Sequence, residues 1–299
     1  MKIGFIGLGI MGNPMVKTLV KKGHDVYVND INEESIKKLE NIGANRGDFK
    51  KISEECNFII TMLPNSDCVE NVVLDQKNGL INYIKSGAVL IDMSSSIPQS
   101  TIKISKILKK KNIKMLDAPV SGGPPKAKNG TLTIMVGGEK EVFDLSSPIL
   151  YTLGEKLFYI GKTGAGHMAK AINNMLYGTT LVATVEAITL GAKAGVDLKK
   201  LVEVMDASSG HCYAVSKVGK KVFTRNFEPG FATSLLNKDL KIALSMASDL
   251  HVPTIISSAA QQIYELALNE KGFAELDNTV IFKLIEEKLG IKIEAKNDE

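Results

Sequence analysis

Apolar and polar residues follow two distinct patterns along the chain. In the first half, short apolar runs typical of buried strands occur at residues 3–6, 26–28, 58–63, 89–92, 115–117, 132–136 and 157–160. Lysine-rich stretches with apolar residues at helical spacing separate several of these runs, as at 33–42 and 101–111. Strands that alternate with helices predict a parallel sheet with crossover helices. Between the last two runs, we expect Gly137-Gly138 to form a turn.

The pattern changes after Gly161. From residue 165 to 194 there is no proline, and apolar residues recur at helical spacing. Further helices are predicted over residues 198–207, 214–223, 238–250, 254–268 and 280–289. The expected fold class is α/β, with an N-terminal Rossmann-type doubly wound parallel sheet (1–162) followed by an all-α C-terminal domain for substrate binding and oligomerisation (163–299). The polar tail from Ala295 is expected to fray.

Composition narrows the choice of function. The chain has 299 residues, 44% hydrophobic and 23% charged, which is ordinary for a globular protein. A net charge of +4 is too small to predict nucleic-acid binding. Nearly all the positive charge is lysine, because Arg46 and Arg225 are the two arginines. An arginine clamp on an anion is therefore not expected, and lysines, backbone amides and neutral polar groups must hold it.

Metal, disulfide and membrane functions find no support in the sequence. The three cysteines (Cys56, Cys68 and Cys212) form no Cys-x-x-Cys pair, and the four histidines have no His-x-x-x-His spacing. The longest charge-free run covers 15 residues, 171–185, which is short of the roughly 20 that a membrane span needs. The chain begins directly with a strand pattern, so we expect no signal peptide, no membrane partner and a cytoplasmic location.

The first apolar run leads into a glycine-lined segment that could bind a dinucleotide. Its residues are Gly7, Leu8, Gly9, Ile10, Met11 and Gly12. In a strand–turn–helix unit, the first glycine permits the tight turn, the second admits the pyrophosphate and the third allows close packing. The same spacing also occurs in ordinary turns, so its context decides the interpretation.

The context is a second strand pattern that ends at Asn29-Asp30. Asp30 lies 18 residues after Gly12, about where a ribose-binding acid is expected. Its carboxylate would accept hydrogen bonds from the ribose hydroxyls and repel a 2′-phosphate, which favours NAD, with NADP as the alternative. Another interpretation is that Asp30 caps the helix expected near Glu33.

Three further segments carry candidate chemistry. Ser121, Gly122 and Gly123 follow a strand pattern and could direct backbone amides at a carboxylate, although turn formers also make ordinary loops. Lys170 and Asn174 are one helical turn apart. Most helical lysines are solvated, but apolar neighbours would destabilise this ammonium and suit it for proton transfer. Lys238-Asp239, taken alone, is typical of an exposed helix start.

Over essentially its whole length the chain resembles the β-hydroxyacid dehydrogenase family. The resemblance rests on four motifs in order: Gly-Leu-Gly-Ile-Met-Gly at 7–12, Asp-Ala-Pro-Val-Ser-Gly-Gly at 117–123, Gly-x-x-Gly-x-Gly-x-x-x-Lys-x-x-Asn-Asn at 161–174 and Lys-Asp-Leu at 238–240. The segments GFIGLGIMGNPM, ITMLPNS, LIDMSS and MLDAPVSGG are most similar to members that reduce 2-hydroxy-3-oxopropionate. Residues 208–214 instead resemble members that act on 2-(hydroxymethyl)glutarate.

The resemblance implies roles for individual residues. Lys170 matches the catalytic lysine, while Ser121, Gly122, Gly123 and Asn174 match substrate-binding positions. Cofactor contacts are implied for the glycine-lined segment and for Asn29, Asp30, Leu63, Pro64, Asn65, Ser95 and Lys238. Ser95 stands where the family usually has threonine. The wall of the substrate pocket is expected to include His211 and Phe231, with contributions from Tyr213 and Lys238.

The function implied by the family is hydride transfer between NAD(P) and a small 3-hydroxy acid or its semialdehyde, without a metal. The expected substrate is 2-hydroxy-3-oxopropionate, with 3-hydroxyisobutyrate and 2-(hydroxymethyl)glutarate as alternatives. A 6-phosphogluconate-type decarboxylase is disfavoured because arginine is scarce. A non-catalytic dinucleotide-sensing module would not need the substrate residues. Apolar helical faces predict a homodimer or homotetramer.

Overall fold

The structure is a computed structural model that describes residues 1–295. The expected fraying tail from Ala295 onward therefore lies almost entirely outside the described residues. The chain forms two compact units, the first spanning Met1–Lys170 and the second beginning at Ala171. The boundary expected after residue 162 falls between a strand and a helix, whereas the two units divide inside that helix.

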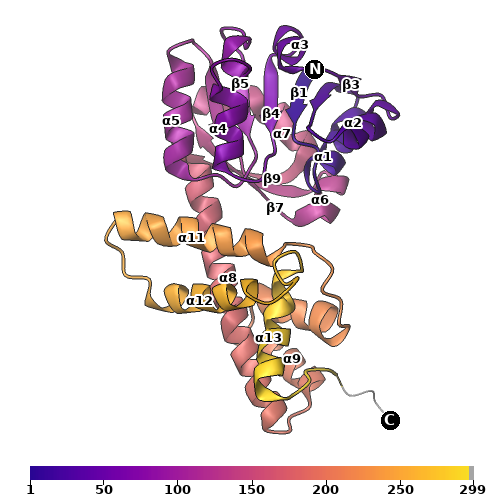
Figure 1. Ribbon diagram of the computed structural model, residues 1–299, viewed down its shortest axis with the longest axis vertical. Coiled ribbons are helices and arrows are strands. Elements are labelled where there is room, and N and C mark those ends of the chain that lie inside the picture. Colours follow the sequence, from indigo (N-terminus) through magenta and orange to yellow (C-terminus); the bar gives the residue numbers. More distant parts are fainter. Residues whose placement is uncertain (296–299) are drawn as a thin grey trace. The chain divides into compact units, whose positions relative to one another are not determined.

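The first unit is built on one sheet (Figure 1). Its strands are β1 (Lys2–Ile6), β2 (Asp25–Asn29), β3 (Asn45–Arg46), β4 (Phe58–Thr61), β5 (Val89–Asp92), β6 (Lys114–Asp117), β7 (Val120–Ser121), β8 (Leu132–Gly138) and β9 (Gly154–Gly161). The order is β3-β2-β1-β4-β5-β6-β8-β7, and β9 pairs with β8. The six strands from β3 to β6 are parallel. This order is that of a doubly wound dinucleotide-binding sheet, and its direction switches between β1 and β4.

Helices cover both faces of this sheet (Figure 1). They are α1 (Gly12–Lys21), α2 (Glu33–Glu40), α3 (Phe49–Glu55), α4 (Ser66–Leu74), α5 (Pro98–Lys109), α6 (Gly123–Asn129) and α7 (Lys140–Leu153), with a 3₁₀ turn at Leu80–Asn82. Adjacent residues of one strand enter different cores. Ile91 packs with Leu19 of α1, whereas Leu90 packs with Val69 of α4 and Ile104 of α5. This alternation explains why the strands are continuously apolar.

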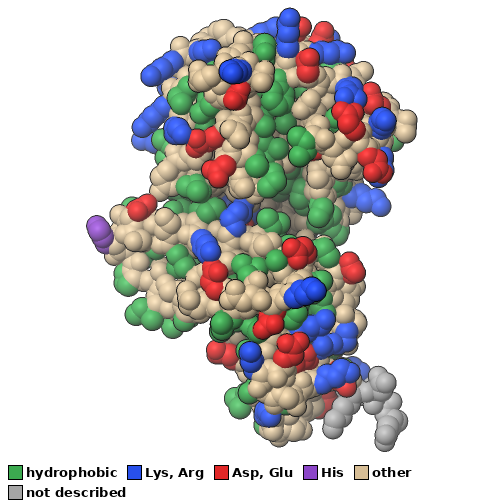
Figure 2. All heavy atoms as spheres, viewed as in Figure 1, with side chains coloured by type: hydrophobic (Ala, Val, Ile, Leu, Met, Phe, Trp, Pro, Cys, Tyr) green, Lys and Arg blue, Asp and Glu red, His purple; other side chains and the backbone are tan. Residues whose placement is uncertain are grey.

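Helix α5 shows how the lysine-rich stretches fit this arrangement. Ile104 and Leu108 are buried, while Lys103, Lys106 and Lys109 are exposed on the opposite side. Figure 2 shows blue side chains over this helix at the edge of the first unit. The helical spacing of apolar residues at 101–111 therefore predicted a real helix, with a boundary error of a few residues.

The turn expected at Gly137-Gly138 is wrong. Both glycines belong to β8, and the crossover helix α7 connects β8 to the parallel strand β9. A Cβ atom at Gly137 would lie 2.7 Å from the carboxylate oxygens of Asp117, so glycine is required here by close packing inside the sheet. The sequence pattern does not distinguish this need from a turn.

The second unit is helical. Helix α8 (Ala165–Lys193) begins in the first unit, and the following elements are α9 (Leu198–Ala207), α10 (Tyr213–Lys217), a π-helix at Val218–Phe223, α11 (Thr233–Asp249), α12 (Ile255–Leu268), a 3₁₀ turn at Asn278–Val280 and α13 (Ile281–Leu289). Tyr264 and Phe282 are fully buried in its core. Burial raises the pKa of Tyr264, whose hydroxyl donates to the Gly178 carbonyl at 2.9 Å. These observations confirm the predicted fold class.

The sequence predicts no run long enough to span a membrane, because the charge-free run at 171–185 is short. The whole helix α8, however, is long and apolar enough to cross one by length and composition. This finding is weak evidence for a membrane protein, because core helices of soluble proteins meet the same criteria. Within α8, 44% of the most apolar 18-residue stretch is buried. A cytoplasmic location remains a prediction.

Candidate active site

The glycine-lined turn between β1 and α1 has the form that the sequence predicts. Gly7 has a φ of +98°, and a Cβ at Gly12 would lie 1.9 Å from the Gly7 carbonyl oxygen. A Cβ at Gly9 would meet no atom within 4 Å, so the space over Gly9 is open. The first amides of a helix have no intrahelical acceptor, and here they follow this open turn. The turn therefore fits a dinucleotide pyrophosphate.

Asp30 joins this turn to the end of β2. One carboxylate oxygen accepts the Leu8 amide at 2.5 Å, and the other accepts the Asn32 amide at 2.7 Å. The helix α2 is capped by Asn32, which accepts the amides of Glu34 and Ser35. The interpretation of Asp30 as the helix cap is therefore wrong. Asn29 donates its side-chain amide to the Gly47 carbonyl at 2.8 Å.

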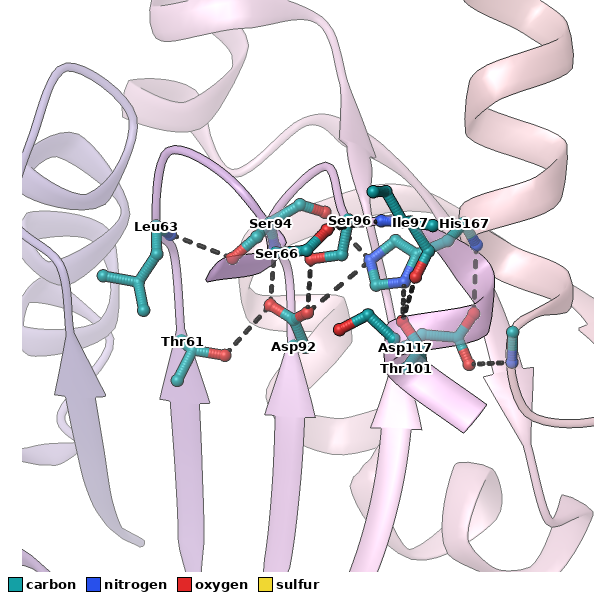
Figure 3. Close-up of polar contacts among 12 residues, drawn as sticks. Thr61, Leu63, Ser66, Asp92, Ser94, Ser96, Ile97, Thr101, Asp117 and His167 are labelled. Atoms are coloured by element: carbon teal, nitrogen blue, oxygen red, sulfur yellow. Dashed lines mark hydrogen bonds and ion pairs between the residues drawn. The ribbon is translucent and has the colours of Figure 1, made fainter. Parts of the chain in front are cut away.

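Two loops at the carboxyl ends of β4 and β5 are bound together (Figure 3). The Leu63 amide donates to Ser94 Oγ at 2.9 Å, and the Ile97 amide donates to Ser66 Oγ at 2.7 Å. Asn65 caps α4 by accepting the Cys68 amide. Pro64 and the half-buried Ser95 lie in the same two loops. The structure thus brings the predicted cofactor loops together at one edge of the sheet.

A buried polar network lies beneath these loops (Figure 3). One oxygen of Asp92 accepts Thr61 Oγ1 at 3.0 Å and the Ser94 amide at 3.1 Å. The other accepts Ser96 Oγ at 2.9 Å and lies 3.8 Å from His167 Nε2. Sequence reasoning assigned no role to Asp92, although a carboxyl group at the end of a wholly apolar strand was a usable signal.

His167 belongs to the start of α8. Its Nε2 lies 3.0 Å from the Ser94 carbonyl oxygen, and its Nδ1 lies 2.8 Å from Thr101 Oγ1. The imidazole is fully buried. Sequence reasoning also assigned His167 no role, because its partners lie 66 and 73 residues away in the chain.

Asp117 stabilises the N-terminus of α8, on which Lys170 lies. Its two oxygens accept the Gly164 amide at 2.7 Å and the His167 amide at 3.0 Å, and a carboxylate is favourable at this end of a helix. A Cβ at Gly166 would lie 2.5 Å from the Met135 carbonyl oxygen. The glycines before Lys170 therefore allow the helix start to approach β8 closely. Lys170 itself is half-buried.

Ser121, Gly122 and Gly123 lie where β7 passes into α6. Both glycines have positive φ, +132° and +67°, which L residues rarely adopt. A Cβ at Gly122 would also collide with the side chain of Lys126, 2.5 Å away. The segment therefore needs glycine for its conformation, as expected of a backbone turn that presents amides.

In the second unit, Asp239 brings together two of the predicted residues. Its carboxylate accepts the Asn174 side-chain amide at 2.6 Å and lies 3.3 Å from Lys238 Nζ. Asp239 is only 2% exposed and lies inside α11, so the interpretation of Lys238-Asp239 as an exposed helix start is wrong. Sequence reasoning missed Asp239 as a partner of Asn174.

The expected pocket residues of the second unit lie on different segments. His211 is exposed and its ring contacts Asp206 at 3.0 Å, whereas Phe231 is half-buried and its amide donates to Asp277. Tyr213 is exposed and its ring packs edge-on against Tyr177. Tyr213 is the first residue of α10 and His211 lies just before it, whereas Phe231 lies just before α11.

The described residues include no cluster of His, Cys, Asp and Glu able to hold a metal ion. The three cysteines are free thiols. Burial raises the pKa of Cys56 to about 12, so this thiol is not a nucleophile at neutral pH.

The sheet order, the open glycine turn and the acid at the end of β2 are those of a dinucleotide-binding domain of the Rossmann class. Residues 2–161 match the family model of the NAD binding domain of 6-phosphogluconate dehydrogenase. Residues 164–285 match the model described as NAD-binding of NADP-dependent 3-hydroxyisobutyrate dehydrogenase. The chain belongs to the β-hydroxyacid dehydrogenase family and is an NAD(P)-dependent hydroxyacid dehydrogenase.

Individual relatives of known name match this chain over nearly its full length. The chain is 38% identical to 2-(hydroxymethyl)glutarate dehydrogenase of Eubacterium barkeri, over 98% of this chain and 97% of that one. It is 36% identical to mouse mitochondrial 3-hydroxyisobutyrate dehydrogenase, over 96% and 87%. The structure of 3-hydroxyisobutyrate dehydrogenase from Mycobacterium tuberculosis with L-serine matches with a TM-score of 0.88 and 29% identity, over 95% and 98%. The non-catalytic sensing module is therefore set aside.

Proposed function

We propose that this chain interconverts a small 3-hydroxy acid and its semialdehyde, that 2-hydroxy-3-oxopropionate is its substrate, and that Lys170 is its catalytic residue. The observation that carries the proposal is the placement of Lys170 at the start of α8. Asp117 caps this helix start, which lies in the same compact unit as the open glycine turn.

The chemistry divides among the residues as follows. NAD, when bound, supplies or accepts the hydride. Lys170 Nζ gives a proton to the carbonyl oxygen during reduction and takes the hydroxyl proton during oxidation. The Ser121 hydroxyl and the amides of Gly122 and Gly123 bind the substrate carboxylate and thereby orient the reacting carbon. Asn174 positions the substrate, and Asp239 orients its amide.

The cofactor contacts proposed are those of the predicted loops. Gly9 and the start of α1 approach the pyrophosphate, and Asp30 binds the ribose. The remaining members of the set are Gly7, Leu8, Ile10, Met11, Gly12, Asn29, Leu63, Pro64, Asn65, Ser95 and Lys238. Support comes from the open space at Gly9 and from the bonds between the β4 and β5 loops.

A second candidate substrate is 2-(hydroxymethyl)glutarate. Two observations favour it: the 38% identity to a dehydrogenase of that name, and the segment 208–214, which resembles that subfamily. This molecule carries a second carboxylate, which would need a cationic partner. A lysine, rather than an arginine, is the available type, because Arg46 and Arg225 are each engaged with a glutamate.

The test is a panel of semialdehydes and 3-hydroxy acids with purified protein, in which NADH absorbance is followed. We expect turnover with 2-hydroxy-3-oxopropionate and a loss of about 10²–10⁴-fold in kcat in Lys170→Ala, because a positioned acid–base group is removed. NADH affinity should change little. Lys193→Ala is the control, since this lysine lies in the last turn of the same helix.

Two results would contradict the proposal. Equal kcat for Lys170→Ala and Lys193→Ala would remove the proton-transfer role. Higher kcat/KM with 2-(hydroxymethyl)glutarate or 3-hydroxyisobutyrate than with 2-hydroxy-3-oxopropionate would replace the proposed substrate.

We also propose that the protein is a homodimer or homotetramer. The support is the set of large apolar side chains left exposed on two helices of the second unit: Ile172, Leu176 and Leu190 on α8, and Ile255 and Ile256 on α12. Self-association would remove such surface from water.

A further inference from the structure

The buried network of Figure 3 connects three segments of the first unit that carry proposed active-site residues. Asp92 and His167 are its centre. Both contact Ser94, whose hydroxyl accepts the Leu63 amide, so the loop after β5 is joined to the loop after β4 and to the start of α8. We propose that Asp92 and His167 are positioning residues, which fix Ser95 relative to Lys170. The proposal rests on the functions proposed above for Ser95 and Lys170.

Asp92 holds the loop after β5 from both sides of Ser95. The Ser94 amide donates to one of its oxygens and the Ser96 hydroxyl donates to the other. Ser95 therefore sits between two anchored neighbours and is itself half-buried. Asp92 is 0% exposed, and a buried carboxylate is tolerated only when its oxygens are satisfied. Displacement of the loop would break these bonds and is therefore unfavourable.

His167 links that loop to the helix. Since a carbonyl oxygen can only accept a hydrogen bond, Nε2 of His167 carries a hydrogen and donates it to the Ser94 carbonyl. The other ring nitrogen contacts Thr101 on α5. Lys170 follows three residues later, so it lies on the same side of α8, one turn along. The ring thus sets the distance between the β5 loop and the turn of α8 that presents Lys170.

Neither residue can take part in the chemistry directly. Both side chains are buried, so neither reaches a substrate. A purely structural role would lower stability and leave the turnover of the folded protein unchanged. A positioning role would also lower kcat, because small displacements of reacting groups have large effects on rate.

Thr101 and Ser100 provide a matched pair of variants on α5. Thr101 contacts His167 Nδ1 at 2.8 Å, whereas the neighbouring Ser100 donates to Glu70 at 2.7 Å, outside the network. We expect Thr101→Val and His167→Gln to lower kcat by about 10- to 100-fold. The deuterium isotope effect with labelled NADH should rise, since hydride transfer becomes slower than the other steps. Ser100→Ala should keep the wild-type kcat and isotope effect.

His167→Gln should retain more activity than His167→Ala, because a glutamine amide can still donate to the Ser94 carbonyl. Equal kcat and isotope effect in Thr101→Val and Ser100→Ala, or equal activity of the two His167 variants, would overturn the positioning role. Thermal unfolding identifies variants that fail to fold, and Thr101→Val, the mildest change, then decides the question.

Failure of the proposed substrate gives a different result. If the wild type reduces no semialdehyde, NADH binding is measured by fluorescence titration instead. Weaker NADH binding in Thr101→Val and His167→Gln than in Ser100→Ala supports the positioning of the β5 loop. Equal binding in all three variants overturns it.

Discussion

At the scale of single residues, Asp30 and Asp75 have the same structural task in different places. Asp30 accepts the amides of Leu8 and Asn32, and Asp75 accepts those of Lys77 and Asn78. Asp30 lies at the carboxyl end of β2, beside the open turn, whereas Asp75 follows the C-terminus of α4. Only Asp30 is therefore expected to meet the ribose of a dinucleotide.

The expected consequence is a cofactor preference that depends on Asp30. The wild type should use NADH better than NADPH. Asp30→Asn removes the charge that repels a 2′-phosphate, so the NADPH/NADH ratio of kcat/KM should rise by about tenfold, the scale of one charged contact near a protein surface. Asp75→Asn should leave this ratio unchanged. Steady-state kinetics with both cofactors checks the prediction, and a wild type that prefers NADPH would contradict it.

Single residues were predictable where the local pattern states a physical need. Gly9 and Asp30 stand at fixed offsets from strand patterns, and the structure gives them suitable surroundings. Asp92 and His167 were not predictable, because their partners come from distant segments and no local pattern records them. Asp239 was misjudged for the same reason, since its partner Asn174 is 65 residues away.

At the scale of elements, the turn between β1 and α1 separates the needs of the fold from those of binding. Gly12 is fixed by its approach to the Gly7 carbonyl, but Gly9 has space for a side chain. Gly9→Ala should therefore keep the free energy of unfolding within about 0.5 kcal/mol of the wild type. Its methyl group would occupy the space proposed for the pyrophosphate, so NADH binding should weaken about tenfold or more.

Gly137→Ala is the contrasting variant, because its methyl group would collide with Asp117. It should destabilise the protein by about 1–3 kcal/mol. Urea unfolding and NADH titration measure both effects. Unchanged NADH affinity in Gly9→Ala would show that the cofactor does not approach that turn.

Elements with strong periodicity were predicted well. The strand at 89–92 and the helix at 198–207 match the observed bounds. Helix α7 was missed because Gly137-Gly138 was taken as a turn. The helix expected at 214–223 divides into α10 and a π-helix, a change of hydrogen bonding that side-chain spacing does not reveal.

At the scale of the whole molecule, each compact unit has its own core. Two clusters cover the sheet faces of the first unit, and a separate cluster centred on Tyr264 and Phe282 fills the second. The predicted division into an α/β part and a helical part follows from this separation of apolar patterns. Self-association would cover the apolar residues that are exposed on the second unit.

Light scattering coupled to size exclusion should therefore give twice or four times the mass of one chain. Leu190→Glu places a charge on an exposed apolar position of α8 and should shift the protein toward monomer. Leu145→Glu, at an exposed position on α7 in the first unit, is the control and should leave the mass unchanged. A monomeric wild type would refute the proposal.

The engagement of both arginines has a consequence for inhibitor design. Arg46 donates two hydrogen bonds to Glu33, and Arg225 donates two to Glu286, all with lengths of 2.6–2.9 Å. An inhibitor with a phosphonate or sulfonate group would have to displace a glutamate before it could bind either guanidinium group. Compounds that present one small carboxylate avoid that competition, and they are the better starting point for a screen.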